Sequence, residues 1–222
     1  MSIAEHIQSF QQQLENKGCT LVAVSKTKPI ADLEEAYQAG QRHFGENKVQ
    51  EMVSKYEELP KDIHWHMIGH LQRNKVKYLA PFVHLIHGVD SLRLLKEIDK
   101  QGHKNERVID CLLQVHIAKE ENKFGFDEEE LTSLLADQEF VDLTFVRIKG
   151  LMGMATFTEN KATIQNEFAG LKALFDKIKE KFVGENILME DLSMGMTNDY
   201  EIALEEGSNM VRIGSAIFGE RN

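Results

Sequence analysis

Short apolar runs alternate with helix-like patterns along the whole chain. Eight runs have the length and aliphatic content of strands: 21–26, 43–47, 64–69, 83–89, 109–117, 149–155, 187–192 and 210–213. Helical spacing precedes the first run and follows each of the first seven, at 3–14, 29–40, 49–59, 71–79, 91–98, 127–135, 164–182 and 198–206. This alternation predicts an α/β fold, a single (β/α)8 TIM barrel domain over residues 1–222 with a leading amino-terminal helix. An open doubly wound sheet is the alternative, which the count of eight strands disfavours.

The helix boundaries carry signals of their own. Pro29 fits the first turn of a helix, and Ser91 is a typical N-cap residue. Asp127 and Glu130 have the spacing of a capping box, and Gly207 predicts the end of the last long helix. These signals agree with the boundaries that the apolar pattern predicts.

The composition narrows the functional classes. The 222 residues include 26 Lys and Arg against 36 Asp and Glu, a formal net charge of −10, which argues against nucleic-acid binding. Cys19 and Cys111 lie in or beside apolar runs without metal-ligand spacing, which indicates buried thiols. No apolar run reaches membrane-spanning length and the polar amino terminus has no signal core, so we expect a cytoplasmic protein without membrane contact.

Lys26 is the first candidate for chemistry, because it ends the first predicted strand. Val22, Val24 and Lys26 share one face of that strand. In a parallel barrel, catalytic and binding groups lie at the carboxyl ends of the strands. The alternative is a solvated lysine that merely flanks a buried strand.

The ends of the last two predicted strands suggest a phosphate site. The loops after strands seven and eight of this fold, with the start of a short extra helix, commonly bind phosphate. Here they contain Ser193, Gly214 and Ser215, which offer hydroxyl and backbone N–H donors. The alternative is that these glycine and serine residues only form ordinary turns and bind no phosphate. A lysine in the same barrel mouth points further, to a Schiff base with an aldehyde-bearing phosphate, for which pyridoxal phosphate is the leading candidate.

Several motifs together resemble one known family, the pyridoxal phosphate homeostasis proteins (the YggS/PROSC family). They are V-S-K at 24–26, F-G-E-N at 44–47 with V-Q-E at 49–51, H-M-I-G-H-L-Q-R-N-K at 66–75, G-L-M at 150–152, L-S-M-G-M at 192–196, and residues 211–219. They occur in order over nearly the whole chain.

The resemblance implies a barrel of the alanine-racemase type that holds pyridoxal 5′-phosphate as a Schiff base on Lys26. In the same way it implies that Arg212 faces the pyridine nitrogen and that Ser193, Gly214 and Ser215 hold the phosphate. It places Asn47 near the ring and His66 in the pocket, with a core histidine as an equal alternative for His66. Lys48, His70 and His116 depart from the family pattern, so the resemblance does not define their roles.

Two other features are weaker. His64, His66 and His70 invite a metal site, but no carboxylate or cysteine completes a ligand set, so no metal is expected. The charged stretch 118–126 reads as a surface loop, with a cover over the barrel mouth as the alternative.

Two functional classes fit these residues. The first is a non-enzymatic carrier that buffers or delivers pyridoxal phosphate, with apo forms of pyridoxal phosphate enzymes as recipients. The second is a pyridoxal phosphate-dependent amino-acid racemase, which needs a proton donor on each face of the substrate. In the two-domain racemases the second donor comes with a carboxyl-terminal β-domain, for which a chain ending at residue 222 has no room. The carrier, expected as a monomer, is therefore favoured.

Overall fold

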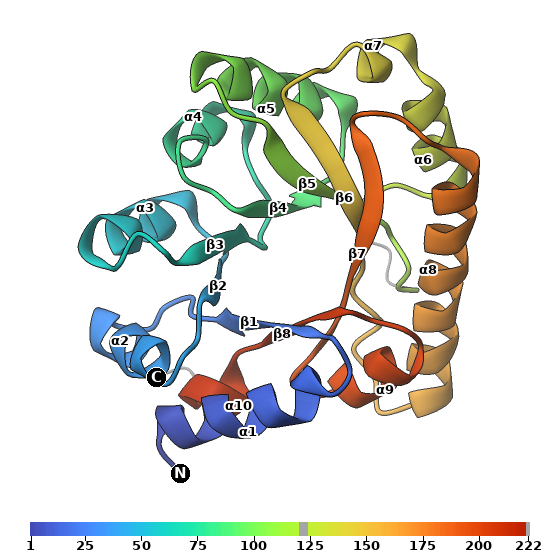
Figure 1. Cartoon of the computed structure of the whole chain (residues 1–222). Coiled ribbons are helices and arrows are strands. Elements are labelled where there is room, and N and C mark those ends of the chain that lie inside the picture. Colours follow the sequence, from blue (N-terminus) through green and yellow to red (C-terminus); the bar gives the residue numbers. More distant parts are fainter. Residues whose placement is uncertain (120–123, 221–222) are drawn as a thin grey trace.

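Eight parallel strands close into a barrel in the computed structural model, and helices cover its outside (Figure 1). The structure describes residues 1–119 and 124–220. The strands follow one another around the barrel as β1 (Thr20–Val24), β2 (His43–Glu46), β3 (His64–Met67), β4 (Leu85–Val89), β5 (Ile109–Gln114), β6 (Val146–Met152), β7 (Ile187–Met196) and β8 (Met210–Ile213). Because β8 pairs with β1, with Leu21 opposite Val211, the sheet closes without an open edge. The predicted (β/α)8 barrel is confirmed, and the open sheet is excluded.

The helices form the outer layer of the molecule (Figure 1). They are α1 (Ile3–Glu15), α2 (Ile30–Gln38), α3 (Val49–Glu58), the 3₁₀ turn η1 (Arg73–Lys75), α4 (Val76–Leu79), α5 (Leu92–Lys104), α6 (Glu128–Ala136), α7 (Gln138–Val141), α8 (Lys161–Lys181), α9 (Tyr200–Glu205) and α10 (Ser215–Phe218). The leading helix α1 packs against α2 and α10. Among the described residues, no helix is long and apolar enough to cross a membrane.

Three of the four helix-boundary signals act as the sequence predicts, whereas Pro29 is the N-cap residue of α2 and lies just before its first turn. The Ser91 hydroxyl accepts a hydrogen bond from the Leu94 amide at the start of α5. Asp127 and Glu130 form a reciprocal capping box at the start of α6. Gly207 adopts a φ of +91° just after α9, a conformation that favours glycine.

Some boundaries differ from the apolar pattern. The strand β1 ends at Val24, so Lys26 lies just beyond it. The strand β7 runs on to Met196, four residues past the predicted end, because ladder pairing with β6 and β8 holds its small and polar residues. The predicted helix 71–79 is split into η1 and α4, and α7 was not predicted. Residues 120–123 of the predicted charged loop lie outside the described residues.

The core has two parts. The larger part packs between the outer face of the strands and the helices, and includes Phe44, Trp65 and Phe168, all fully buried. The smaller part lies inside the barrel and consists of Val22, Leu85, Leu112, Met152 and Met210. The rest of the interior is unusually polar, because histidines and one arginine fill inward positions on the strands.

Candidate functional site

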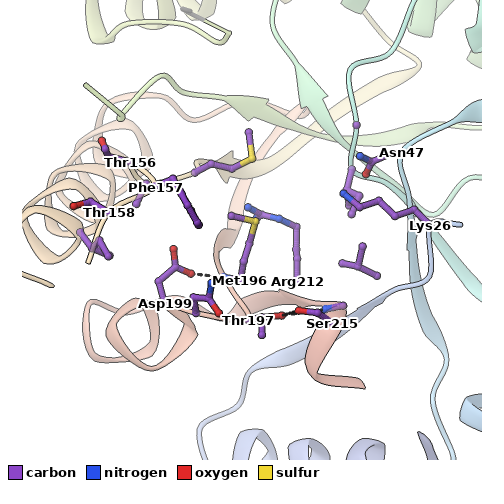
Figure 2. Close-up of a pocket in the computed structure, with 18 of the residues that line it drawn as sticks. Lys26, Asn47, Thr156, Phe157, Thr158, Met196, Thr197, Asp199, Arg212 and Ser215 are labelled. Atoms are coloured by element: carbon purple, nitrogen blue, oxygen red, sulfur yellow. Dashed lines mark hydrogen bonds between the residues drawn. The ribbon is translucent and has the colours of Figure 1, made fainter. Parts of the chain in front are cut away.

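A cavity of about 1020 Å³ opens at the carboxyl ends of the strands. Five of the seven predicted site residues line it: Lys26, Asn47, Arg212, Gly214 and Ser215. Figure 2 shows Lys26 and Asn47 on one side, Thr156, Phe157 and Thr158 on the other, and Arg212 between them. The two remaining predicted residues, His66 and Ser193, are fully buried and do not line the cavity.

The backbone at Lys26 is held by a buried network. The Ser25 hydroxyl donates to Glu46 Oε1 at 2.6 Å, and Lys55 Nζ donates to that same oxygen at 2.7 Å. Lys55 Nζ also donates to the Ser25 carbonyl at 2.8 Å. The residue before Lys26 is therefore fixed through both its side chain and its carbonyl.

The residue after Lys26 is fixed by the same network. Thr27 adopts a φ of +67°, which is strained for a β-branched residue. Its amide donates to Glu51 Oε1 at 2.5 Å, and Lys55 Nζ lies 2.8 Å from that oxygen. Backbone strain beside a cavity residue, maintained by a buried ion-pair network, is typical of a functional position.

The ion pair between Glu46 and Lys55 is almost completely buried, with side-chain exposures of 0 % and 6 %. Burial raises the pKa of Glu46, and the charge and hydrogen bonds of Lys55 oppose that rise. Glu46 Oε2 has no hydrogen-bond partner among the described residues. Glu46, Glu51 and Lys55 are not among the site residues predicted from the sequence. A signal was present, because a glutamate inside the buried strand run F-G-E requires a partner.

Asn47 follows β2 directly and lies beside the end of β3. A Cβ atom at Gly69 would lie 2.6 Å from the Asn47 carbonyl oxygen, so only glycine allows this approach. The side chain of Asn47 lines the cavity on the same side as Lys26 (Figure 2).

Arg212 points inward from β8 and is 4 % exposed. It donates from Nη1 to the Ser193 hydroxyl at 2.6 Å and to the Ser193 carbonyl at 2.9 Å, and from Nη2 to the Gly153 carbonyl at 3.1 Å. Burial lowers the pKa of Arg212 to about 10, and the charge of Asp199 opposes that shift, so the guanidinium is charged at neutral pH. A guanidinium has five N–H donors, and two of them have no acceptor within the described residues.

Hydroxyl and amide donors gather where β7 and β8 end. The hydroxyls of Thr197 and Ser215 lie 3.3 Å apart (Figure 2). The amides of Ser215 and Ala216 begin α10, and within the described residues they have no acceptor, as expected for the first turn of a helix. Together they form a set of donors at the cavity wall.

Among the described residues that line the cavity, cationic side chains outnumber anionic ones. They comprise Lys26, Lys28, Lys161 and Arg212, against Glu159 and Asp199, with His70 in addition. This local excess contrasts with the net charge of −10 for the chain. The cavity therefore suits an anionic ligand.

Ser193 and His66 belong to a chain of hydrogen bonds beneath Arg212. The Ser193 hydroxyl lies 3.1 Å from His87 Nδ1, and His87 Nε2 lies 2.9 Å from His66 Nδ1. His66 Nε2 lies 2.9 Å from His43 Nδ1, and His43 Nε2 lies 3.3 Å from His64 Nδ1. The chain leads through the barrel interior from Arg212 to the exposed His64. His43 and His87 are not among the site residues predicted from the sequence.

The three positions that depart from the family pattern have different environments. Lys48 is exposed and precedes α3. His70 lines the cavity, with Nδ1 at 3.4 Å from Asp90 Oδ2, so it does not join His64 and His66. The amide of His116 donates to the Phe126 carbonyl.

Comparison with known proteins agrees with the fold. The family model for the N-terminal domain of alanine racemase matches residues 1–222. A pyridoxal phosphate homeostasis protein of Aquifex aeolicus is 42% identical over 90% of this chain and 86% of that protein. The structure of PipY from Synechococcus elongatus with pyridoxal phosphate bound is 36% identical, with a TM-score of 0.88 over 98% of this chain and 100% of PipY.

A more distant similarity extends to the racemases. Alanine racemase from Bartonella henselae is 16% identical, with a TM-score of 0.73, and this chain covers 58% of its length. At that identity the similarity shows the fold alone. The full-length family match and the close relatives show more: the chain belongs to the pyridoxal phosphate homeostasis proteins, which are built on the N-terminal barrel of alanine racemase.

Proposed function

We propose that this protein binds pyridoxal 5′-phosphate at the barrel mouth, with Lys26 as its covalent anchor, and takes part in homeostasis of that cofactor. The observation that carries the proposal is that Lys26, Arg212 and the first turn of α10 line one cavity. The relatives named as homeostasis proteins, and PipY with the cofactor bound, support it.

The donors at the end of β8 suit the phosphate group. The Ser215 hydroxyl donates to the Thr197 hydroxyl, and the Thr197 hydroxyl with the amides of Ser215 and Ala216 provides three donors, without a carboxylate among them. Gly214 lines the cavity beside them. In this proposal Ser193 acts indirectly, because its hydroxyl holds Arg212 and is itself fully buried.

The residues around the ring favour a carrier over an enzyme. Pyridoxal phosphate supplies an aldehyde that forms a Schiff base with a lysine amine, and a ring that withdraws electrons best when its nitrogen is protonated. Arg212 is charged and can only donate, so opposite the ring nitrogen it disfavours that proton. Asn47 lies on the Lys26 side and is placed to contact the ring, while His66 supports Arg212 from below through His87 and Ser193.

Borohydride reduction tests the anchor. Purified protein reconstituted with pyridoxal phosphate should give a stable adduct that peptide mass mapping assigns to Lys26, and Lys26→Ala should lose both the adduct and the visible absorbance band. Lys28→Ala is the matched control, because Lys28 also lines the cavity but its amine donates to the Phe218 and Glu220 carbonyls. An adduct found solely on another lysine contradicts the assignment.

Steady-state assays separate the carrier from the racemase. With a panel of L- and D-amino acids, a carrier should give no racemisation above that of free cofactor. Turnover that disappears in Lys26→Ala would instead favour the racemase. The proposal further includes apo-enzymes as recipients of the cofactor, which mixing experiments test. It also includes a monomeric state, which light scattering tests, and a cytoplasmic location, which cell fractionation tests.

A further inference from the structure

Four histidines gather inside the barrel, away from the cavity. His43 belongs to β2, His64 and His66 belong to β3, and His84 directly precedes β4. Their ring centroids lie 4.3–5.6 Å from one another in the five contacts among them. None of the four lines the cavity that holds Lys26. The proposed cofactor site involves only His66 of these four, indirectly through His87 and Ser193, and leaves His43, His64 and His84 without a function.

We propose that His43, His66 and His84 form a binding site for a divalent transition-metal ion of the zinc class. One ring nitrogen from each of the three lies within 4.8 Å of the others. Imidazole nitrogen is a preferred ligand of zinc, nickel and copper, whereas magnesium and calcium prefer oxygen. A ligand set of imidazoles alone therefore selects this class of metal.

Two of the three ligand atoms already have nearly the required separation. His43 Nδ1 and His66 Nε2 lie 2.9 Å apart. In a tetrahedral zinc site with bonds of about 2.0–2.1 Å, ligand nitrogens lie about 3.3 Å apart. The metal would replace the proton that these two nitrogens share. Since all three nitrogens lie within 4.8 Å, His84 has to approach by at most about 1.5 Å.

In His43 and His66, the ring nitrogen that does not face the metal already has a hydrogen-bond partner. A histidine that binds metal through one nitrogen usually donates the N–H of its other nitrogen to a neighbouring acceptor. His66 Nδ1 lies 2.9 Å from His87 Nε2, and His43 Nε2 lies 3.3 Å from His64 Nδ1. With metal bound, His66 donates to His87 and His43 donates to His64.

The third proposed ligand is His84. The ring nitrogens of His84 form no hydrogen bond within the described part of the chain, although the ring stacks on His64. His64 is exposed and His43 and His84 are partly exposed, which gives an ion access from the amino end of the barrel and leaves room for water as the fourth ligand.

Metal titration of the full chain tests the proposal. Chelator-treated protein without cofactor should bind one Co²⁺ or Zn²⁺ per chain, with the visible spectrum of tetrahedral cobalt and with shifted imidazole ¹⁵N signals for His43, His66 and His84. His43→Gln and His84→Phe should each weaken binding at least about 100-fold, since losing a ligand costs more than losing an outer partner. His103→Gln is the matched control, because His103 is an exposed histidine on α5 outside the cluster.

Three outcomes overturn the proposal: no stoichiometric binding to the wild type, equal binding by His84→Phe, or a ¹⁵N response confined to other histidines. The NMR arm uses the wild type, so it decides the question even if a variant fails to fold. The borohydride adduct on Lys26 is a separate readout, so the metal site and the cofactor site succeed or fail independently.

Discussion

Ser215 begins α10 at the barrel mouth, where its hydroxyl lies 3.3 Å from the Thr197 hydroxyl. If the phosphate of the cofactor binds here, Ser215→Ala removes one neutral donor, which costs about 0.5–1.5 kcal/mol of binding free energy. Ser215→Asp adds a carboxylate against the phosphate and should cost more, at least about tenfold in affinity. Equilibrium dialysis against pyridoxal phosphate measures both effects.

The control for this charge change is Ser133→Asp, which adds the same charge to an exposed position of α6. It should leave the affinity unchanged. Equal affinities of Ser215→Asp and wild type would place the phosphate elsewhere in the cavity. The Schiff-base assignment to Lys26 would then remain, because it has its own test.

At the scale of elements, one buried ion pair connects β2, α3 and the end of β1. Lys55→Met leaves Glu46 buried without its cation and should lower the free energy of unfolding by about 3–5 kcal/mol. Glu46→Gln combined with Lys55→Met should recover most of this loss, because a neutral amide still accepts from the Ser25 hydroxyl. Urea denaturation measures the free energy of unfolding for each variant.

An exposed pair provides the comparison. Lys96→Met removes the partner of Glu139, whose side chain is 62 % exposed, and should change stability by at most about 1 kcal/mol. If Lys55→Met is no more destabilising than Lys96→Met, the network does not hold the backbone around Lys26. Loss of the Lys26 adduct in Lys55→Met would link the network to the position of that lysine.

The order and type of the elements could be predicted because each strand and helix has its own apolar period. The extension of β7 through Ser193 and Gly195 could not, since only pairing with its neighbours holds those residues in a strand. Lys26 could be placed at the barrel mouth from strand parity, and Arg212 from the family resemblance. The contact between His43 and His66 could not be predicted, because it depends on the register between β2 and β3.

The whole barrel encloses histidines that remain neutral when folded. Burial lowers the pKa of His66 and His87 well below the usual value, and it lowers the pKa of His84 to about 4. Unfolded histidine has a pKa of about 6.5, so below that pH the unfolded chain takes up protons that the folded chain cannot. Stability should therefore fall as the pH decreases from about 6.5 to about 4, by up to about 1.4 kcal/mol per pH unit for each such histidine.

Glu46 and Asp199 change the pH dependence of stability in the direction opposite to that of the histidines. Burial raises the pKa of each carboxyl group, so the stability that they contribute is present at low pH and is lost as the pH rises through the folded pKa. The acid loss from the histidines is therefore partly offset in the wild type. A variant that changes one histidine isolates its contribution.

His84→Phe is that variant, and the measurement is urea denaturation in the presence of chelator from about pH 7 to about pH 4.5. The charged neighbours that shift the pKa of His84 are Asp110, which raises it, and Arg107 and Lys149, which lower it together with His64.

At neutral pH the His84→Phe variant should be less stable than the wild type, because phenylalanine replaces the imidazole ring that stacks on His64. The difference should shrink by up to about 1.4 kcal/mol per pH unit below about pH 6.5, since the phenylalanine of the variant takes up no proton when unfolded. His103→Gln, at an exposed position of α5, is the control for the removal of a histidine outside the cluster. A constant difference between His84→Phe and the wild type would mean that His84 titrates alike in the folded and unfolded chain.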